Sequence, residues 1–169
     1  MVRRVLKGDN DAYAELVNAH QGQAVAMALH LCGDFETAQD LAQEAFLQAY
    51  RSLASLKHPA AFRAWLYGIL RNVCRTHLSR RPPPAASLEG NGVPEPSAPA
   101  DDTVEMMSVL NTLDLEHREV LAARYLLEMD YKEIAQMLGI TVNNVRVRCF
   151  RAKQALRAAL AGDGGVASG

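Results

Sequence analysis

The chain has 169 residues, of which 49% are hydrophobic and 22% charged, and its formal net charge is −1 at pH 7. This is enough apolar sequence for one medium-sized or two small domains with packed cores. No stretch approaches the roughly 18 apolar residues of a membrane span, and the basic N-terminus lacks the apolar run of a signal peptide, so we expect a soluble, cytoplasmic protein.

Apolar residues at helical spacing predict two helices in the first part of the chain. The first opens after the polar turn "GDND" and ends at Gly33, and the second is capped by Asp34. The second helix has an apolar stripe between Ala38 and Leu53, which we assign to a core. Its opposite face is polar and carries Gln39, Asp40, Gln43 and Glu44.

A third helix follows "KHPAAF", where Pro59 suits a first helical turn. No acid occurs between Glu44 and Glu89, whereas basic residues recur throughout that block. A charge run is usually a solvated face, but a basic track with aromatic side chains is also what single-stranded DNA binding requires. The third helix supplies such a track: Arg63, Trp65, Tyr67, Arg71, Asn72 and Arg75.

Residues 82–102 are predicted to form a flexible linker between two helical lobes. Six of the seven prolines of the chain lie there: Pro82, Pro83, Pro84, Pro94, Pro96 and Pro99. The linker and its exit are acidic and contain no Lys or Arg, so the near-zero net charge conceals two basic blocks separated by an acidic segment.

The C-terminal lobe is predicted to contain a helix-turn-helix. After helices over 104–113 and 115–127, Asp130 caps a short helix that Gly139 ends, and Thr141 caps a last helix from Val142 to about Leu160. Two helices joined by a short turn that contains Gly are typical of this DNA-binding motif. We therefore predict an all-α fold of two small domains, 1–81 and 103–161, followed by a disordered tail over 162–169.

The last helix is predicted to have a core side and a DNA side. Its core side consists of Val142, Val145, Cys149, Ala152, Leu156, Ala159 and Leu160. The opposite side consists of Asn143, Asn144, Val147, Phe150, Arg151 and Gln154, with Arg146 and Arg148 on its flanks. Asn, Gln and Arg can bond to base edges in a major groove, Val147 can contact a thymine methyl, and Arg146, Arg148 and Lys153 can bind phosphates. The alternative is an ordinary solvated amphipathic helix.

We predict neither a metal site nor a catalytic site. Cys32, Cys74 and Cys149 are odd in number and widely spaced, which disfavours a disulfide framework. His30 and Cys32 would diverge on a helix, so they do not resemble the paired ligands of structural zinc. The His, Cys and acidic residues form no recognisable catalytic set, and no cofactor is expected.

Two segments resemble a known family. "GDFETAQDLAQEAFLQAYRSL" with "FRAWLYGILRNVCRTHLSRR" resembles region 2 of bacterial extracytoplasmic-function (group IV) sigma factors, and "LEHREVLAARYLLEMDYKEIAQMLGITVNNVRVRCFRAKQALRAAL" resembles their region 4. The resemblance covers most of the chain outside the linker and tail. The chain departs from the family at Val147 and Phe150, where a small polar residue and His are frequent.

The resemblance implies a subunit of RNA polymerase that recognises promoters. Asp40, Gln43 and Glu44 would bind the polymerase, and the third helix with the loop before it would hold the −10 element as a single strand, through Lys57, Arg63, Trp65, Arg71, Asn72 and Arg75. The last helix would bind the −35 duplex through Asn143, Asn144, Arg146, Val147, Arg148, Arg151 and Gln154. An anti-sigma factor is a further implied partner.

Two other functions remain open at this point. One is a stand-alone helix-turn-helix repressor or activator, although no dimerisation helix or effector pocket is evident. The other is a module that binds only a regulatory protein through its N-terminal lobe. A repressor would bind duplex DNA alone, whereas a sigma factor would require core polymerase.

Overall fold

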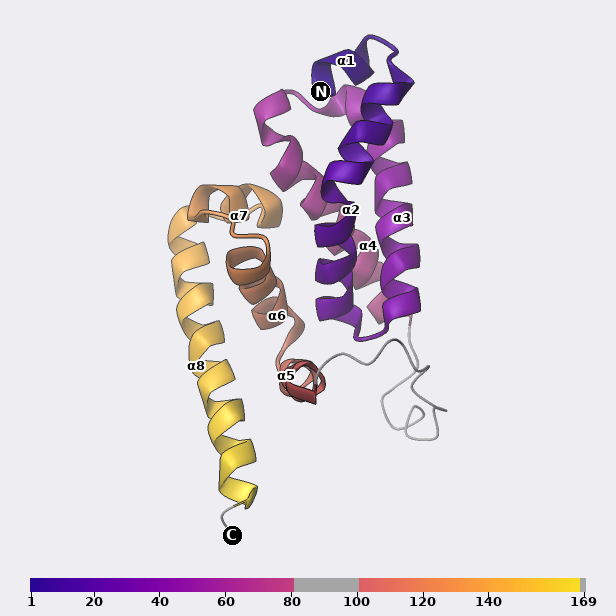
Figure 1. Ribbon diagram of the computed structural model, residues 1–169. Coiled ribbons are helices and arrows are strands. Elements are labelled where there is room, and N and C mark those ends of the chain that lie inside the picture. Colours follow the sequence, from indigo (N-terminus) through magenta and orange to yellow (C-terminus); the bar gives the residue numbers. More distant parts are fainter. Residues whose placement is uncertain (81–100, 168–169) are drawn as a thin grey trace.

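The computed structural model describes the backbone of residues 1–80 and 101–167, and the side chains of 1–80 and 105–162. The described residues form helices and no strand, as the sequence predicts. The N-terminal lobe consists of α1 (Val2–Leu6), α2 (Asn10–Cys32), α3 (Phe35–Ser52), the 3-10 turns η1 (Leu53–Ser55) and η2 (Pro59–Ala61), and α4 (Phe62–Ser79). Figure 1 shows α2, α3 and α4 packed along one another, with α1 across one end.

The helix ends of this lobe follow from local chemistry. The side chain of Asp9 accepts a hydrogen bond from the backbone of Ala12 at 3.1 Å, and that of Asp34 accepts one from the backbone of Thr37 at 3.0 Å. These bonds satisfy amide groups that have no partner within the first turn of a helix. Gly33 ends α2 with a φ of 79°, a left-handed conformation that glycine adopts without strain.

The C-terminal lobe consists of α5 (Asp101–Asn111), α6 (Leu115–Leu121), the π-helical segment η4 (Ala122–Leu126), α7 (Tyr131–Leu138) and α8 (Val142–Ala167). Asp130 and Glu133 form a reciprocal capping box at the start of α7, and Gly139 ends that helix with a φ of 67°. The hydroxyl of Thr141 accepts a hydrogen bond from the backbone of Asn144 at 3.1 Å. The helix-turn-helix is therefore formed by α7 and α8, as predicted.

Several boundaries differ from the sequence-based expectations. Helix α1 was not predicted, because a five-residue helix has too little periodicity to detect. The expected helix over 115–127 changes into a π-helix at Ala122. Helix α8 continues to Ala167 rather than ending near Leu160, although the segment after Leu160 contains three glycines, which disfavour helix. Helix α5 begins at Asp101, and residues 82–100 of the predicted linker lie outside the described residues.

The two lobes lie against each other and share one hydrophobic core cluster. Helix α4 packs against α7, and α2 packs against α6 and η4, while α8 lies on the side of the C-terminal lobe that is remote from α3 (Figure 1). The contact between α4 and α7 depends on Gly68: a Cβ atom there would lie 3.2 Å from the backbone oxygen of Met137. We call this packing of the lobes the closed arrangement.

Candidate nucleic-acid and protein interfaces

The outer side of α8 is exposed along its whole predicted DNA surface. Side chains on that side are Asn143, Asn144, Val147, Phe150, Arg151 and Gln154, and all are exposed, as is Arg146. Phe150 is the most exposed of the large hydrophobic side chains of the C-terminal lobe, at 62%. Arg148 is half-buried, with Nη1 4.0 Å from the carboxylate of Glu116. Polar and apolar groups that can contact base edges are thus presented on one helix face.

The inner side of α8 fixes that orientation. Val145, Cys149 and Ala152 are buried in the core, while Val142, Leu156 and Ala159 pack against it. Leu160 does not fit the prediction, because its side chain is 44% exposed. The reason is that α8 extends past the rest of the lobe towards its C-terminal end, where Figure 1 shows no helix beside it.

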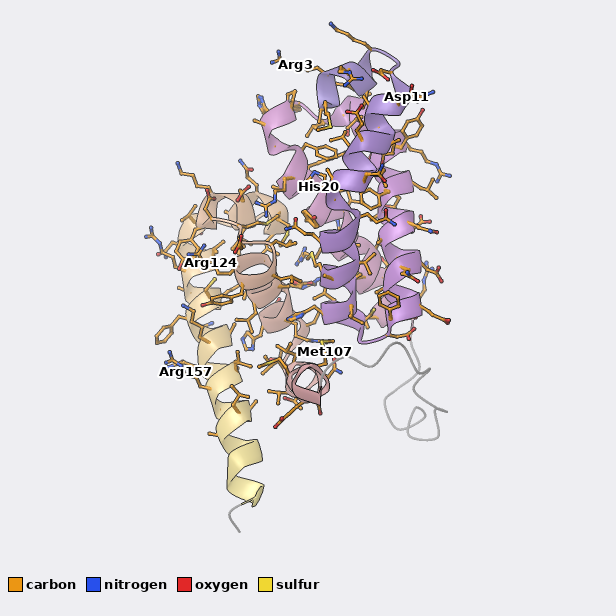
Figure 2. All side chains as sticks on the ribbon, in the orientation of Figure 1. Arg3, Asp11, His20, Met107, Arg124 and Arg157 are labelled. Carbon is orange, nitrogen blue, oxygen red and sulfur yellow. The ribbon has the colours of Figure 1, made fainter. Side chains whose placement is uncertain are left out.

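Arg124 joins the predicted phosphate-binding residues Arg146 and Lys153 near the DNA side of α8, and it was missed from the sequence. The guanidinium groups of Arg124 and Arg146 lie 5.2 and 5.8 Å from the ring centroid of Tyr131, and the ammonium of Lys153 lies 5.6 Å from that of Tyr125. Figure 2 shows Arg124 next to α8. Aromatic faces attract cations, so the two tyrosines gather positive charge beside the DNA side of α8. The only sequence signal is the isolated Arg-Tyr pair of η4.

The predicted −10 residues, Lys57 in the loop before α4 and the others on α4, fall into two groups. Lys57 and Asn72 are exposed, and Trp65 is half-buried. Arg63, Arg71 and Arg75 instead contact the C-terminal lobe: Arg63 binds the carboxylate of Glu133 at 3.3 Å and also donates to the backbone oxygen of Leu127. In the closed arrangement these three arginines are therefore occupied by protein groups.

Tyr67 cannot belong to this track. Its side chain is fully buried, and its hydroxyl donates to Gln23 at 3.4 Å. Burial raises the pKa of Tyr67 to about 12. Tyr67 lies one turn after Arg63 and one turn before Arg71, but its ring packs against His20 of α2, so it is not available to stack on a base.

Glu119 is the charged residue that the sequence analysis overlooked. It is the one fully buried charged side chain among the described residues, at 0% exposure. Arg75 donates two hydrogen bonds to its carboxylate, at 2.5 and 3.0 Å, and Nε of Arg71 lies 2.9 Å from the same carboxylate without hydrogen-bond geometry. We call Glu119, Arg71 and Arg75 the inter-lobe ion cluster. It joins α6 to α4.

The predicted polymerase-binding residues lie beside a groove. Asp40, Gln43 and Glu44 are exposed on α3. Asp40 and Gln43 line a groove of about 680 Å³ between α2 and α3, together with apolar side chains. The largest of these are Tyr13, Val17, Val25, Phe46, Leu47 and Tyr50. Leu47 and Tyr50 are about half exposed, at 51% and 47%, so the groove combines exposed apolar area with the carboxylate of Asp40.

The described residues hold no group of three His, Cys, Asp or Glu side chains that could bind a metal ion. Burial raises the pKa of the Cys74 thiol to about 12 and also raises that of Cys149. Reactivity requires the thiolate, so both side chains are held in the unreactive thiol form. None of the described helices is long and apolar enough to cross a membrane.

The chain matches two family models that together cover both lobes. Residues 16–82 match Sigma-70 region 2, and residues 103–156 match Sigma-70 region 4. The RNA polymerase sigma-H factor of Pseudomonas aeruginosa is 33% identical, over 95% of this chain and 92% of its own length. The extracytoplasmic-function RNA polymerase sigma-E factor of Escherichia coli is 31% identical, over 92% of this chain and 90% of its own length.

Solved structures agree with this fold. CnrH, solved with the cytosolic domain of CnrY, superposes with a TM-score of 0.77 at 27% identity, and 96% of each chain is covered. The sigma factor RpoE of Bartonella quintana superposes with a TM-score of 0.73 at 22% identity, over 88% of this chain and 96% of its own, which supports the fold alone.

Proposed function

This chain belongs to the sigma-70 family, as an extracytoplasmic-function sigma factor, and we propose that it binds core RNA polymerase and recognises promoters through both lobes. Sigma factors are subunits that direct transcription initiation, rather than enzymes in their own right. In this proposal, the lobe of 1–81 binds the polymerase and the −10 element, and the lobe of 103–161 binds the −35 element. The observation that carries the proposal is the exposed outer side of α8, fixed by a buried inner side.

The C-terminal lobe binds the −35 duplex through α8. Asn143, Asn144, Arg151 and Gln154 contact base edges, and Val147 contacts a thymine methyl group. Arg146, Arg148 and Lys153 bind phosphates on the two walls of the groove. Support comes from the exposure of all these side chains except the half-buried Arg148 and Lys153, and from the position of Arg146 beside Arg124 at the ring of Tyr131.

The N-terminal lobe binds the −10 element as a single strand. Lys57 and Asn72 are accessible in the closed arrangement, and the half-buried ring of Trp65 offers an apolar edge for a base. Arg63, Arg71 and Arg75 can contact DNA only after they leave Glu133 and Glu119. Recognition of the −10 element by these arginines therefore requires the lobes to separate.

The face of α3 binds the polymerase. Asp40 and Gln43 line an apolar groove and Glu44 is exposed next to them on α3, so a helical partner with basic residues would match both features. A regulatory protein is a second proposed partner, because the relative CnrH was solved in complex with the cytosolic domain of CnrY.

Assembly with core polymerase tests the proposal directly. The purified chain is mixed with core enzyme and separated by size-exclusion chromatography. We expect the chain to co-elute with core enzyme at stoichiometric amounts, and the complex to melt promoter DNA. A chain that elutes alone at micromolar concentrations of both components would refute the polymerase-binding part of the proposal.

A further inference from the structure

The inter-lobe ion cluster has the form of an occupied anion site. Arg71 and Arg75 lie one turn apart on α4, so their side chains emerge on the same face. The carboxylate of Glu119 sits between them, 2.9 Å from Nε of Arg71 and 2.5 Å from Nε of Arg75. Guanidinium groups bind carboxylates and phosphates with similar planar geometry. The same two arginines can therefore hold a phosphate.

The burial of Glu119 requires an explanation. A carboxylate with 0% exposure is costly unless it is paired, and its partners here come from the other lobe, not from its own. A hydrophobic residue at the same place would bury at no such cost. The acid is therefore suited to a contact that must be both specific and reversible.

We infer that Arg71 and Arg75 form a site for a backbone phosphate of single-stranded DNA, and that Glu119 occupies this site in the closed arrangement and so inhibits DNA binding. This inference rests on the proposed function of α4 in binding the −10 element. Glu119 acts as an internal substitute for the phosphate, and the C-terminal lobe competes with DNA for one face of α4.

Neighbouring contacts extend the occlusion along α4. Arg63, two turns before Arg71, binds Glu133 and the backbone oxygen of Leu127. Between them, Gly68 brings α4 against the backbone of Met137. Arg63, Gly68 and Arg71 of α4 are thus each covered by the C-terminal lobe, whereas Asn72, one turn after Gly68, remains exposed.

Because the C-terminal lobe and DNA compete for α4, the apparent DNA affinity depends on the fraction of molecules whose lobes are apart. We call this second state the open arrangement. If the open arrangement holds about a tenth of the molecules, opening the chain fully strengthens single-stranded DNA binding about tenfold without any new contact. Core polymerase or promoter DNA would supply the free energy of opening in the cell. The device also prevents the free subunit from coating single-stranded DNA.

Two substitutions that break the same cluster should have different effects on the affinity for single-stranded DNA. Glu119→Gln removes the competing charge and leaves Arg71 and Arg75 free, whereas Arg75→Gln breaks the cluster but removes a phosphate ligand. Small-angle X-ray scattering on the full chain measures lobe separation through the radius of gyration. Fluorescence anisotropy with a labelled single-stranded oligodeoxynucleotide of mixed sequence measures affinity.

We expect both variants to have a larger radius of gyration than the parent chain. Glu119→Gln should bind the oligonucleotide about tenfold more tightly, and Arg75→Gln should show no such gain. Glu105→Gln is the matched control: its side chain is exposed on α5 of the same lobe, it removes the same charge, and neither measurement should change. Circular dichroism checks that each variant folds.

Gly68→Leu tests the same idea without altering a charge, should Glu119→Gln fold poorly. Its side chain cannot fit against Met137, so it should open the lobes and strengthen DNA binding as Glu119→Gln does. An unchanged radius of gyration in both variants, or an open chain with unchanged affinity, would overturn the inference. Failure of the proposed function has a different signature, since the parent chain would then not assemble with core polymerase at all.

Discussion

The carboxylate of Glu119 and the guanidinium of Arg75, 44 residues apart in the chain, lie 2.5 Å apart where the two lobes meet. This contact joins the helix that precedes the helix-turn-helix to the helix proposed to hold the −10 element. It makes the accessibility of one DNA-binding surface depend on the position of the other lobe.

A double-mutant cycle should show that the two side chains are coupled. We expect the free energies of unfolding of Glu119→Gln, Arg75→Gln and the double variant to be non-additive by about 1–2 kcal/mol. The value is modest because the Arg75 side chain is 35% exposed and solvent screens the pair. Urea denaturation of the four proteins gives the coupling energy, and additive effects would contradict a direct interaction.

Charge reversal on α3 should weaken polymerase binding. Asp40→Lys with Glu44→Lys places two cations on α3 where the structure has two exposed carboxylates, one of which, Asp40, lines the groove. We expect the double variant to bind core polymerase at least tenfold more weakly, a loss of about 1.4 kcal/mol or more, and to keep −35 binding. The measurement is a titration of labelled chain with core enzyme.

A matched pair on α2 separates a local effect from one of net charge. Asp11→Lys with Glu15→Lys makes the same charge change at two exposed positions one turn apart that do not line the groove. This pair should leave the affinity for core enzyme unchanged. Equal losses in both double variants would mean that only the total charge matters.

Arg151 and Arg146 should differ in the kind of binding that they supply. Both are exposed, but Arg151 lies on the outer side of α8, whereas Arg146 lies beside Tyr131. Arg151→Ala should lose about 1–3 kcal/mol and relax the preference at one −35 position. Arg146→Ala should weaken binding to all −35 sequences alike. It should also reduce the slope of log affinity against log salt concentration by about one unit. Holoenzyme binding to a randomised −35 element at two salt concentrations distinguishes them, and exchanged behaviour would contradict the proposed orientation of α8.

Stability should fall on mild acidification through His30. Burial, with a further contribution from Arg118, lowers the pKa of His30 in the folded chain. The unfolded chain then binds the proton more readily, so stability is complete above the unfolded pKa of about 6.5 and declines as the pH falls towards the lower folded value. Urea denaturation at neutral and at mildly acidic pH should show this decline, and His30→Gln should reduce it. An identical pH dependence in both proteins would contradict the assignment.

Features with a local cause could be predicted from the sequence. Asp34, Asp130 and Thr141 cap helices because their side chains reach amide groups two or three residues away, and Gly139 ends α7 because glycine tolerates a positive φ. The outer side of α8 was predicted for a similar reason, since the apolar repeat of a helix fixes which side is buried.

Features that arise from tertiary contact could not be predicted. The sequence "REV" around Glu119 looks like any polar helix turn, and nothing local indicates that this acid is buried against Arg71 and Arg75. Tyr67 was placed on the DNA track because its residue type suited stacking, but the packing of α4 buries it. The π-helical turn of η4 was likewise invisible, because its composition is that of an ordinary helix.

Run-off transcription with core RNA polymerase tests the central claim most directly. The template is a library of promoters, and reactions contain the chain alone, core enzyme alone, or both. We predict specific transcripts only when both are present, with start sites downstream of a common pair of spaced elements, while the chain alone binds duplex DNA weakly. Tight, specific operator binding by the chain alone, with no stimulation of core polymerase, would contradict the account and favour a stand-alone repressor.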